Sequence, residues 1–509
     1  MQIPMPPGPF GCAEVLIVTP PFSPHDAGPP AGPAVLKAHL EHLSIPTRTI
    51  DLNIHYLRGF SGGSQQRLAV VGDHAKDRLR VDAARVAFRA SLALSAPDPA
   101  NVPCSVDPVL GLPHTFTEIA RALDDLAARA IWDSFLAAHL FDRMTAPRVL
   151  GISLMGPSQV VPALHIARAA RQRWPTTFIV VGGSHVTLLA DAIAGDARYQ
   201  AHFEGFLTGH AEATLASVVE ALRCGNAPDL MRAGGGAPGP VRPLAPTEWS
   251  APQFEVEELG LYDQPRLALP IQLSRGCSYG RCRMCTYPAV EELMATKTAA
   301  IASRFLADPV LAAAPRLSVK DSLMEVRAMR AFGQVVARAA PSAIWSATTK
   351  ICRALDAQTF RDLHACGLRT VELGVETIHP RLQALVDKPQ SLGLIEGVVA
   401  AGVAAGVSVV VNLIYGFPGE TAEDAVRQLD WFRGLQAAGG GLVNGSHNLL
   451  EINRGSPFAQ NPGAYGIELG PIGPWAFSHV WNAPAWRRDF TENLRELEDE
   501  TRPHQEVAA

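Results

Sequence analysis

Residues 275–288 read Arg275-Gly276-Cys277-Ser278-Tyr279-Gly280-Arg281-Cys282-Arg283-Met284-Cys285-Thr286-Tyr287-Pro288, which brings three of the chain's eight cysteines into nine positions. Three thiolates in one loop can bind three irons of a four-iron, four-sulfur cluster and leave the fourth iron open to another ligand. The alternative is a zinc site, which takes four ligands and often shows a second Cys or His pair nearby. No such pair follows at that spacing. The other five cysteines are scattered along the chain and do not form a disulfide framework.

The cysteine loop follows the first of six candidate strands. Each strand except the last is followed by a helical pattern, and repeated βα units form either a barrel or a doubly wound sheet. Six units are too few for a complete eight-stranded barrel, so the sequence predicts a partial (β/α)6 TIM-type barrel over residues 265–460. The candidate strands are Leu269–Ser274, Leu317–Asp321, Ile344–Thr349, Thr370–Glu376, Ser408–Tyr415 and Ser446–Ile452.

A separate α/β domain is predicted over residues 13–225. Near-continuous apolar strands alternate there with helical patterns, which indicates a parallel, doubly wound (Rossmann-like) sheet that is covered on both faces. We expect a helical insertion at about 55–145, a linker at 226–264 with a Gly/Pro-rich stretch at 233–240, and a C-terminal extension at 461–509 without a clear signal. The candidate strands are Glu14–Thr19, Thr47–Leu52, Arg148–Met155 and Phe178–Val181.

Composition and charge narrow the class of protein. The 509 residues are 47% hydrophobic and 18% charged, which is typical of folded globular domains, and a net charge of −5 argues against a nucleic-acid partner. The apolar stretch Leu394–Phe417 approaches the length of a membrane span, but Glu396, Asn412 and its β-branched second half indicate a helix followed by a buried strand. We therefore expect no membrane partner, and the lack of a secretory signal pattern predicts a cytoplasmic protein.

The cysteine loop resembles that of the radical S-adenosylmethionine (SAM) superfamily, which usually reads Cys-x3-Cys-x2-Cys after the first strand of a partial barrel. This chain departs from the pattern, because four residues separate Cys277 from Cys282 and Met284 stands where an aromatic residue normally precedes the last cysteine. The resemblance implies a [4Fe–4S] cluster on Cys277, Cys282 and Cys285, with SAM on the open iron. It also implies reductive cleavage of SAM to a 5′-deoxyadenosyl radical.

Three further segments of the barrel carry the same resemblance. Val319–Leu323 is similar to a second-strand segment that ends in an acidic residue, here Asp321. Gly374–Thr377 is similar to a fourth-strand segment whose Glu binds SAM, which makes Glu376 the expected SAM ligand, with an ordinary strand-end salt bridge as the alternative. Asn412–Thr421 resembles a fifth-strand exit, where Asn412 and Gly416 are expected near the cofactor because glycine allows close backbone approach.

The domain over 13–225 resembles the cobalamin-binding domain that precedes the barrel in one radical SAM subclass. Matching pieces include Pro20-Pro21 and Asp51-Leu52-Asn53, and ligands of open α/β sheets bind at the carboxyl edge of the strands. No Asp-x-His-x-x-Gly motif occurs, so a histidine on cobalt from that motif is not expected, and one strand-end histidine is expected near the corrin instead. The resemblance implies these cobalamin-binding residues: Ser153, Gln159, Gly182, Gly183, His185, Gly209 and Glu212.

The resemblance implies methyl transfer to an unactivated carbon, in which one SAM methylates reduced cobalamin and a second yields the radical that activates the substrate. Residues 454–467 look like a segment of radical SAM proteins that modify ribosomally made peptides, or simply like a loop that closes the barrel. A peptide or small-molecule substrate and a reductase, flavodoxin or ferredoxin as electron donor are expected. A cobalamin-assisted cyclisation or rearrangement and a non-catalytic carrier are the alternatives. The side chains expected to face the cavity are Tyr287, Tyr415 and Glu451.

Overall fold

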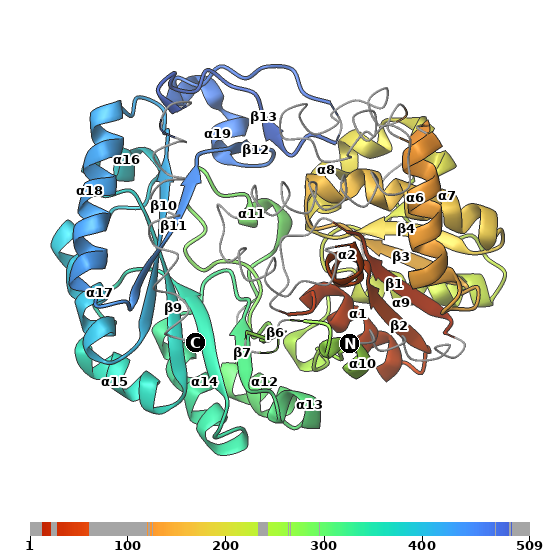
Figure 1. Ribbon diagram of the computed structural model, residues 1–509, viewed down its shortest axis with the longest axis horizontal. Coiled ribbons are helices and arrows are strands. Elements are labelled where there is room, and N and C mark those ends of the chain that lie inside the picture. Colours follow the sequence, from red (N-terminus) through yellow and green to blue (C-terminus); the bar gives the residue numbers. More distant parts are fainter. Residues whose placement is uncertain are drawn as a thin grey trace. The chain divides into compact units, whose positions relative to one another are not determined.

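The computed structural model describes residues 13–21, 28–60, 120, 123–124, 126–232, 243–262, 264, 266–294, 296–473, 475–487 and 490. The chain forms two compact units (Figure 1). Unit 1 contains the described residues up to Gln264 together with the short segment Ile472–Phe477. Unit 2 contains the described residues from 266 to Pro471 and from Ser478 onward.

The core of unit 1 is a five-stranded sheet in the order β2-β1-β3-β4-β5, and every neighbouring pair is parallel. Strands β1, β3 and β4 are apolar and largely buried, since both faces of the sheet are covered. The predicted doubly wound α/β domain is thus confirmed. The strands are β1 (Val15–Thr19), β2 (Thr47–Asp51), β3 (Val149–Ser153), β4 (Phe178–Gly182) and β5 (Gly205–Phe206).

Alternate residues of these strands enter two different hydrophobic clusters. Leu16 and Ile152 pack with helices α7 (Val160–Arg173) and α8 (Ser184–Ala194), whereas Val15 and Val149 pack with α1 (Ala31–His42) and α9 (Glu212–Arg223). This two-residue alternation places helices on both faces of the sheet.

The predicted insertion is helical where the structure describes it. The described helices are α2 (Leu52–Phe60), α6 (Leu126–Leu136) and the π-helical turn η2 (Ala137–Phe141), whereas residues 61–119 lie outside the described residues.

The second half of the range assigned to a linker packs on unit 1. The short helix α10 (Val256–Leu259) follows the buried Glu255, whose carboxylate accepts hydrogen bonds from Lys37 Nζ at 2.6 Å and from the Thr49 amide at 2.9 Å. Residues 243–262 and 264 therefore belong to this unit. The Gly/Pro-rich stretch at 233–240 lies outside the described residues.

Unit 2 contains six parallel strands in sequential order, β6 to β11. Figure 1 shows the helices α12 (Thr298–Phe305), α14 (Val326–Ala339), α15 (Ala357–Ala365), α17 (Leu392–Ala404) and α18 (Ala422–Ala438) along the outer side of this curved sheet. Parallel strands in sequential order with helices on one side form the wall of a (β/α) barrel, and six such strands form the predicted partial barrel. The strands are β6 (Leu269–Ile271), β7 (Arg316–Val319), β8 (Ile344–Thr349), β9 (Leu368–Glu376), β10 (Ser408–Tyr415) and β11 (Val443–Leu449).

The last strand differs from its prediction. It begins at Val443 and ends at Leu449, and a separate short strand, β12 (Ile452–Asn453), pairs antiparallel with β13 (Ser478–His479).

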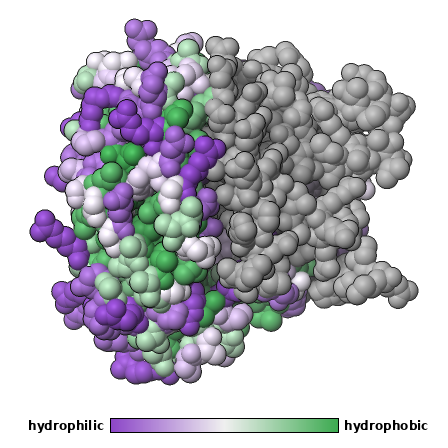
Figure 2. Space-filling model, turned by 60° about the vertical axis from the view of Figure 1, so that its left-hand side comes forward, coloured by the Kyte–Doolittle hydropathy of each residue, from purple (hydrophilic) through white to green (hydrophobic). Residues whose placement is uncertain are grey.

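The apolar stretch 394–417 is divided into α17 and β10, as expected, and among the described residues no helix is long and apolar enough to cross a membrane. Figure 2 shows hydrophilic residues interspersed with hydrophobic ones over one side of the molecule.

Candidate functional site

The cysteine loop leaves the carboxyl end of β6 and is held from the neighbouring strand. Asp321, which follows β7, is buried, and its Oδ1 and Oδ2 accept hydrogen bonds from the Leu273 amide and the Ser274 hydroxyl, both at 2.7 Å. Burial raises the pKa of Asp321 to about 6, against the hydrogen bonds from Ser274 and Leu273, which lower it. Asp321 thus supports the start of the loop, and this use of both oxygens was not anticipated.

A second carboxylate braces the loop at Gly276. The Gly276 amide donates to Glu291 at 2.8 Å, and the Gln272 amide group and the Ser322 hydroxyl donate to the same carboxylate at 2.9 and 2.8 Å. Gly276 has φ of 69°, and a Cβ atom there would lie 2.6 Å from the Cα of Leu293. Only glycine fits this turn without displacing the backbone.

The segment between the first two cysteines turns at Gly280, whose φ is 56°. Tyr279, just before this turn, contacts the segment after β9, because its hydroxyl donates a hydrogen bond to the Asp387 carbonyl. Lys350 Nζ lies 3.4 Å from the centre of the Tyr279 ring. The Arg283 amide donates to the Val386 carbonyl at 3.1 Å. The loop is therefore held on two sides.

Met284, the residue that replaces the usual aromatic, packs into an apolar cluster of unit 2. The buried members of that cluster include Leu382, Val386 and Phe458. Packing against this cluster is consistent with an apolar side chain before the last cysteine.

The three cysteines themselves are free thiols and half-buried. Burial raises the pKa of Cys282 to about 11, opposed by the positive charge of Lys388. Such a thiol is protonated at neutral pH unless a bound metal ion displaces its proton. No three His, Cys, Asp or Glu side chains close on a single ion within the described ranges. In a four-iron cluster, by contrast, each thiolate binds a different iron.

Glu376 ends β9 beside the loop in a backbone conformation that is rare outside glycine, with φ of 66°. Its Oε1 lies 2.7 Å from Nζ of Lys388, and both side chains are nearly buried. Burial alone would lower the pKa of Lys388, but the Glu376 carboxylate outweighs this effect and raises it. The strand-end salt bridge foreseen as the alternative is present. Its lysine, in an irregular segment, gave no sequence signal.

Asn412 and Tyr415, two further residues predicted at the site, lie on opposite faces of β10. In β10, Val409 packs on Gly402 of α17, so Val409, Val411, Leu413 and Tyr415 face the helices, and Asn412 faces the opposite side. The buried Tyr415 hydroxyl is hydrogen-bonded to His447 Nδ1 at 3.0 Å, so it does not face the cavity as predicted.

The structure also shows the surroundings of three further predicted residues, Gly416, Glu451 and Tyr287. A Cβ at Gly416 (φ 83°) would lie 2.6 Å from Cδ of Arg487, so the close approach there is made by the C-terminal extension. Glu451 is exposed and accepts from the Ser478 hydroxyl at 2.8 Å. Tyr287 is 48% exposed and begins the short helix α11 (Tyr287–Val290), two residues after Cys285. Of the three side chains predicted to face the cavity, it is the one adjacent to the cysteines in sequence.

In unit 1 the predicted residues meet at the carboxyl edge of the sheet. The strand order reverses direction between β1 and β3, and Gln159 links the segments after these strands. Its Nε2 donates to the Pro20 carbonyl and its Oε1 accepts from the Met155 amide, both at 2.7 Å. Gln159 thus shapes the edge. Ser153 ends β3 half-buried, and the buried Glu212 begins α9 at the same edge.

The glycines at this edge have two different roles. A Cβ at Gly183 (φ 106°) would overlap the carbonyl oxygen of Leu154, and one at Gly182 would lie 3.1 Å from the Leu207 carbonyl oxygen. These two allow the chain to approach itself. Gly209 (φ 61°) donates its amide to Thr187 Oγ1 at 3.0 Å, and no atom lies within 4 Å of the Cβ position, so its outer side is open.

His185, in the first turn of α8, is completely buried. Neither ring nitrogen has a hydrogen-bond partner among the described residues, and burial lowers the pKa to about 3, so the imidazole is neutral. An unpaired buried polar group costs about 1–3 kcal/mol. A histidine at such a position suggests a ligand rather than packing alone.

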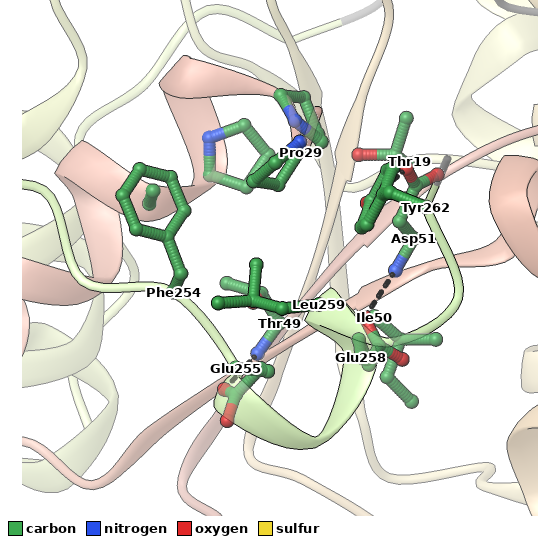
Figure 3. A pocket seen from close by; sticks show the side chains of 13 residues that line it. Thr19, Pro29, Thr49, Ile50, Asp51, Phe254, Glu255, Glu258, Leu259 and Tyr262 are labelled. Carbon is green, nitrogen blue, oxygen red and sulfur yellow. Dashed lines mark hydrogen bonds between the residues drawn. The ribbon is translucent and has the colours of Figure 1, made fainter. Parts of the chain in front are cut away.

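A small pocket lies at the carboxyl ends of β1 and β2 (Figure 3). Its volume of about 20 Å³ accommodates a water molecule. Tyr262 donates to Asp51 at 2.7 Å, and the Thr49 and Asp51 amides donate to the carboxylates of Glu255 and Glu258. Burial raises the pKa of Asp51 to about 6, although the Tyr262 hydrogen bond lowers it. The pocket is too small for a macrocycle.

No family model matches the chain. The heme chaperone HemW of Mycobacterium tuberculosis (strain ATCC 25618 / H37Rv) is 31% identical over 102 residues, which are 20% of this chain and 25% of HemW. The chain thus matches only a quarter of the length of that relative.

Two solved structures resemble most of the chain. The radical SAM methyltransferase TsrM from Kitasatospora setae, with cobalamin and a [4Fe–4S] cluster bound, is 15% identical, with a TM-score of 0.57, over 90% of this chain and 76% of TsrM. The cobalamin-dependent SAM radical enzyme OxsB, with aqua-cobalamin and SAM bound, is 12% identical, with a TM-score of 0.58, over 92% of this chain and 64% of OxsB. The chain therefore has the fold of these cobalamin-dependent radical SAM enzymes, in both of its units.

Proposed function

We propose that the chain is a cobalamin-dependent radical SAM enzyme that transfers a methyl group to an unactivated carbon of a peptide or natural-product substrate. The observation that carries the proposal is the presence, in one chain, of a braced loop with three free thiols in unit 2 and a doubly wound sheet with an unpaired, buried imidazole at its ligand edge in unit 1. The likeness to TsrM and OxsB supports both parts.

The cysteine loop fits a [4Fe–4S] cluster. Asp321 and Glu291 hold the backbone at both ends of its first turn, while Cys277, Cys282 and Cys285 keep free, half-buried thiols. Three thiolates leave one iron open, which is the iron that SAM would bind.

Glu376 and Lys388 fit the polar end of SAM. One carboxylate and one ammonium, 2.7 Å apart, are the complement of the amino and carboxylate groups of an amino acid. The positive φ of Glu376 is a strained conformation of the kind that clusters at ligand sites. We assign these two residues to SAM binding, with Asp321 as a support of the loop.

The carboxyl edge of unit 1 fits a large ligand with polar substituents. Gly209 is open on its outer side, and His185 and Thr19 carry buried polar atoms without partners among the described residues. Buried polar atoms of this kind normally have hydrogen-bond partners, and carboxamide groups like those around a corrin ring can donate and accept such bonds.

When bound, the cluster with SAM supplies a carbon-centred radical and cobalamin supplies a methyl group. The protein's own part is to orient the polar end of SAM with Glu376 and Lys388 and to position the substrate. A barrel alone suffices to make a substrate radical, so a whole additional domain favours delivery of a group to that radical. Cyclisation or rearrangement without methyl transfer is the competing outcome.

The proposal is tested by anaerobic reconstitution of the full chain with iron, sulfide and hydroxocobalamin. We expect about four irons and about one cobalamin per chain, and formation of 5′-deoxyadenosine from SAM on reduction. Binding of both groups without cleavage of SAM would instead indicate a carrier. Failure to retain cobalamin would contradict the assignment of unit 1.

A further inference from the structure

Trp475–Phe477 lie in the C-terminal extension and end the short segment Ile472–Phe477, which belongs to unit 1 although the chain before and after this segment belongs to unit 2. Trp475 is 1% exposed and is part of the larger hydrophobic cluster of unit 1. Its ring meets that of Tyr199 edge-on, with centres 5.1 Å apart. This short segment, Trp475–Phe477, which we call the cover, thus packs on unit 1 through Trp475.

The cover packs on His185 with two flat rings. The imidazole lies nearly parallel to Trp475, with centres 6.1 Å apart and planes at 14°, and to Phe477, at 5.8 Å and 20°. His185 has no exposed surface, whereas Phe477 is half-buried. The rings of the cover therefore shield the imidazole from solvent.

His185 lies at the carboxyl edge of the sheet, where ligands of open α/β sheets bind. It follows Gly182 and Gly183 at the end of β4, and Thr187 of the same helix accepts from Gly209 in the segment after β5. A neutral imidazole has one donor and one acceptor nitrogen, which match the oxygen and the N–H groups of a carboxamide. Aromatic stacking leaves both nitrogens free, since they lie in the plane of the ring.

We propose that Trp475–Phe477 is a movable cover over a cobalamin-binding histidine. Cobalamin reaches His185 only when the cover shifts, and the imidazole then hydrogen-bonds a carboxamide of the corrin rim instead of binding cobalt. This inference rests on the proposed binding of cobalamin to unit 1. His185 is the binding residue, and the two aromatic residues act through it.

The first test compares hydrogen–deuterium exchange of the full chain with and without hydroxocobalamin. We expect faster exchange of the backbone amides of the cover when cobalamin binds, together with slower exchange in the segments after β4 and β5. Unchanged or slower exchange of the cover would overturn the proposal.

The second test uses Phe477→Ala, because Phe477 is half-buried and its removal leaves Trp475 in the core. We expect hydroxocobalamin to associate at least about fivefold faster with this variant, since less of the cover has to move. Trp481→Ala removes an aromatic residue of the same extension from unit 2 and is the matched control. An association rate equal to that of the wild type would contradict a movable cover.

The third test is His185→Phe, which keeps a flat ring and removes both nitrogens. We expect about tenfold weaker cobalamin binding, while the melting temperature of the cobalamin-free variant equals or exceeds that of the wild type because a buried polar ring without partners has been removed. Undiminished affinity would eliminate the histidine contact, and nitrogen hyperfine structure from an imidazole in the Co(II) spectrum of the wild type would replace the rim contact by a cobalt ligand. If wild-type protein binds no cobalamin, the proposed function itself fails, and this outcome differs from each of the others.

Discussion

Nζ of Lys388 lies 2.7 Å from Oε1 of Glu376, and the charge of this lysine also acts on the thiols of Cys282 and Cys285. The pair joins the end of β9 to the segment on which the cysteine loop docks. Because both side chains are nearly buried, either charge left alone would be poorly solvated.

Replacement of Lys388 by Met should therefore impair both stability and SAM binding. Loss of one partner of a nearly buried ion pair costs about 3–5 kcal/mol, and the proposed contact with the SAM carboxylate is lost as well. Thermal melting and equilibrium binding of SAM to the reconstituted protein measure the two effects. Lys388→Arg keeps the charge and should retain most of the binding; equal SAM affinity in Lys388→Met would contradict the assignment.

Alanine at Cys277, Cys282 or Cys285 should abolish the cluster, because each thiolate binds its own iron. Iron content and the visible absorption of the reconstituted variants measure this loss. Cys352→Ala and Cys366→Ala are matched controls, since both residues are free, half-buried cysteines of the same unit. Full iron content in all three loop variants would remove the cluster from this loop.

Asp321→Ala should reduce the iron content without removing a ligand of the cluster. The substitution leaves the Leu273 amide and the Ser274 hydroxyl without their acceptor in a buried position, at a cost of about 2–4 kcal/mol for two hydrogen bonds. Glu325→Ala removes an exposed carboxylate that contacts the same loop through Ser278, at 2.7 Å, and should change stability by less than about 1 kcal/mol. Equal iron retention in the two variants would show that Asp321 does not support the loop.

Asp51 predicts a pH dependence of stability. Burial raises its pKa from 3.8 to about 6, so folding favours the protonated form. The contribution of this group is complete below pH 3.8 and is lost as the pH rises through 6, by about 3 kcal/mol over some two pH units. In Asp51→Asn the melting temperature should fall less between pH 4 and pH 7 than in the wild type. A slope equal to that of the wild type would show that Asp51 does not titrate in this range.

Most of the architecture follows from local pattern. Apolar runs such as Val15–Thr19 have to be buried on both faces, which predicts the parallel sheet, and three cysteines in one loop point to their chemistry without any knowledge of the fold. The alternation in β10 could also have separated Asn412 from Tyr415, because residues three apart in a strand lie on opposite faces.

Long-range partners could not be predicted in this way. Lys388 lies in an irregular segment, and only the folded chain brings it to Glu376. Nothing in the sequence around Asp321 indicates that its carboxylate accepts hydrogen bonds from Leu273 and Ser274. Nothing around Trp475 indicates that its ring belongs to unit 1 and stacks on His185. Each of these depends on which strand ends become neighbours in space.

The most direct test of methyl transfer supplies SAM with a labelled methyl group to reconstituted protein that is converting its substrate. Our account predicts the label in the product, with S-adenosylhomocysteine and 5′-deoxyadenosine formed in a ratio of about one. An unlabelled product, formed with 5′-deoxyadenosine but without S-adenosylhomocysteine, would contradict it and would establish a cyclisation or rearrangement instead.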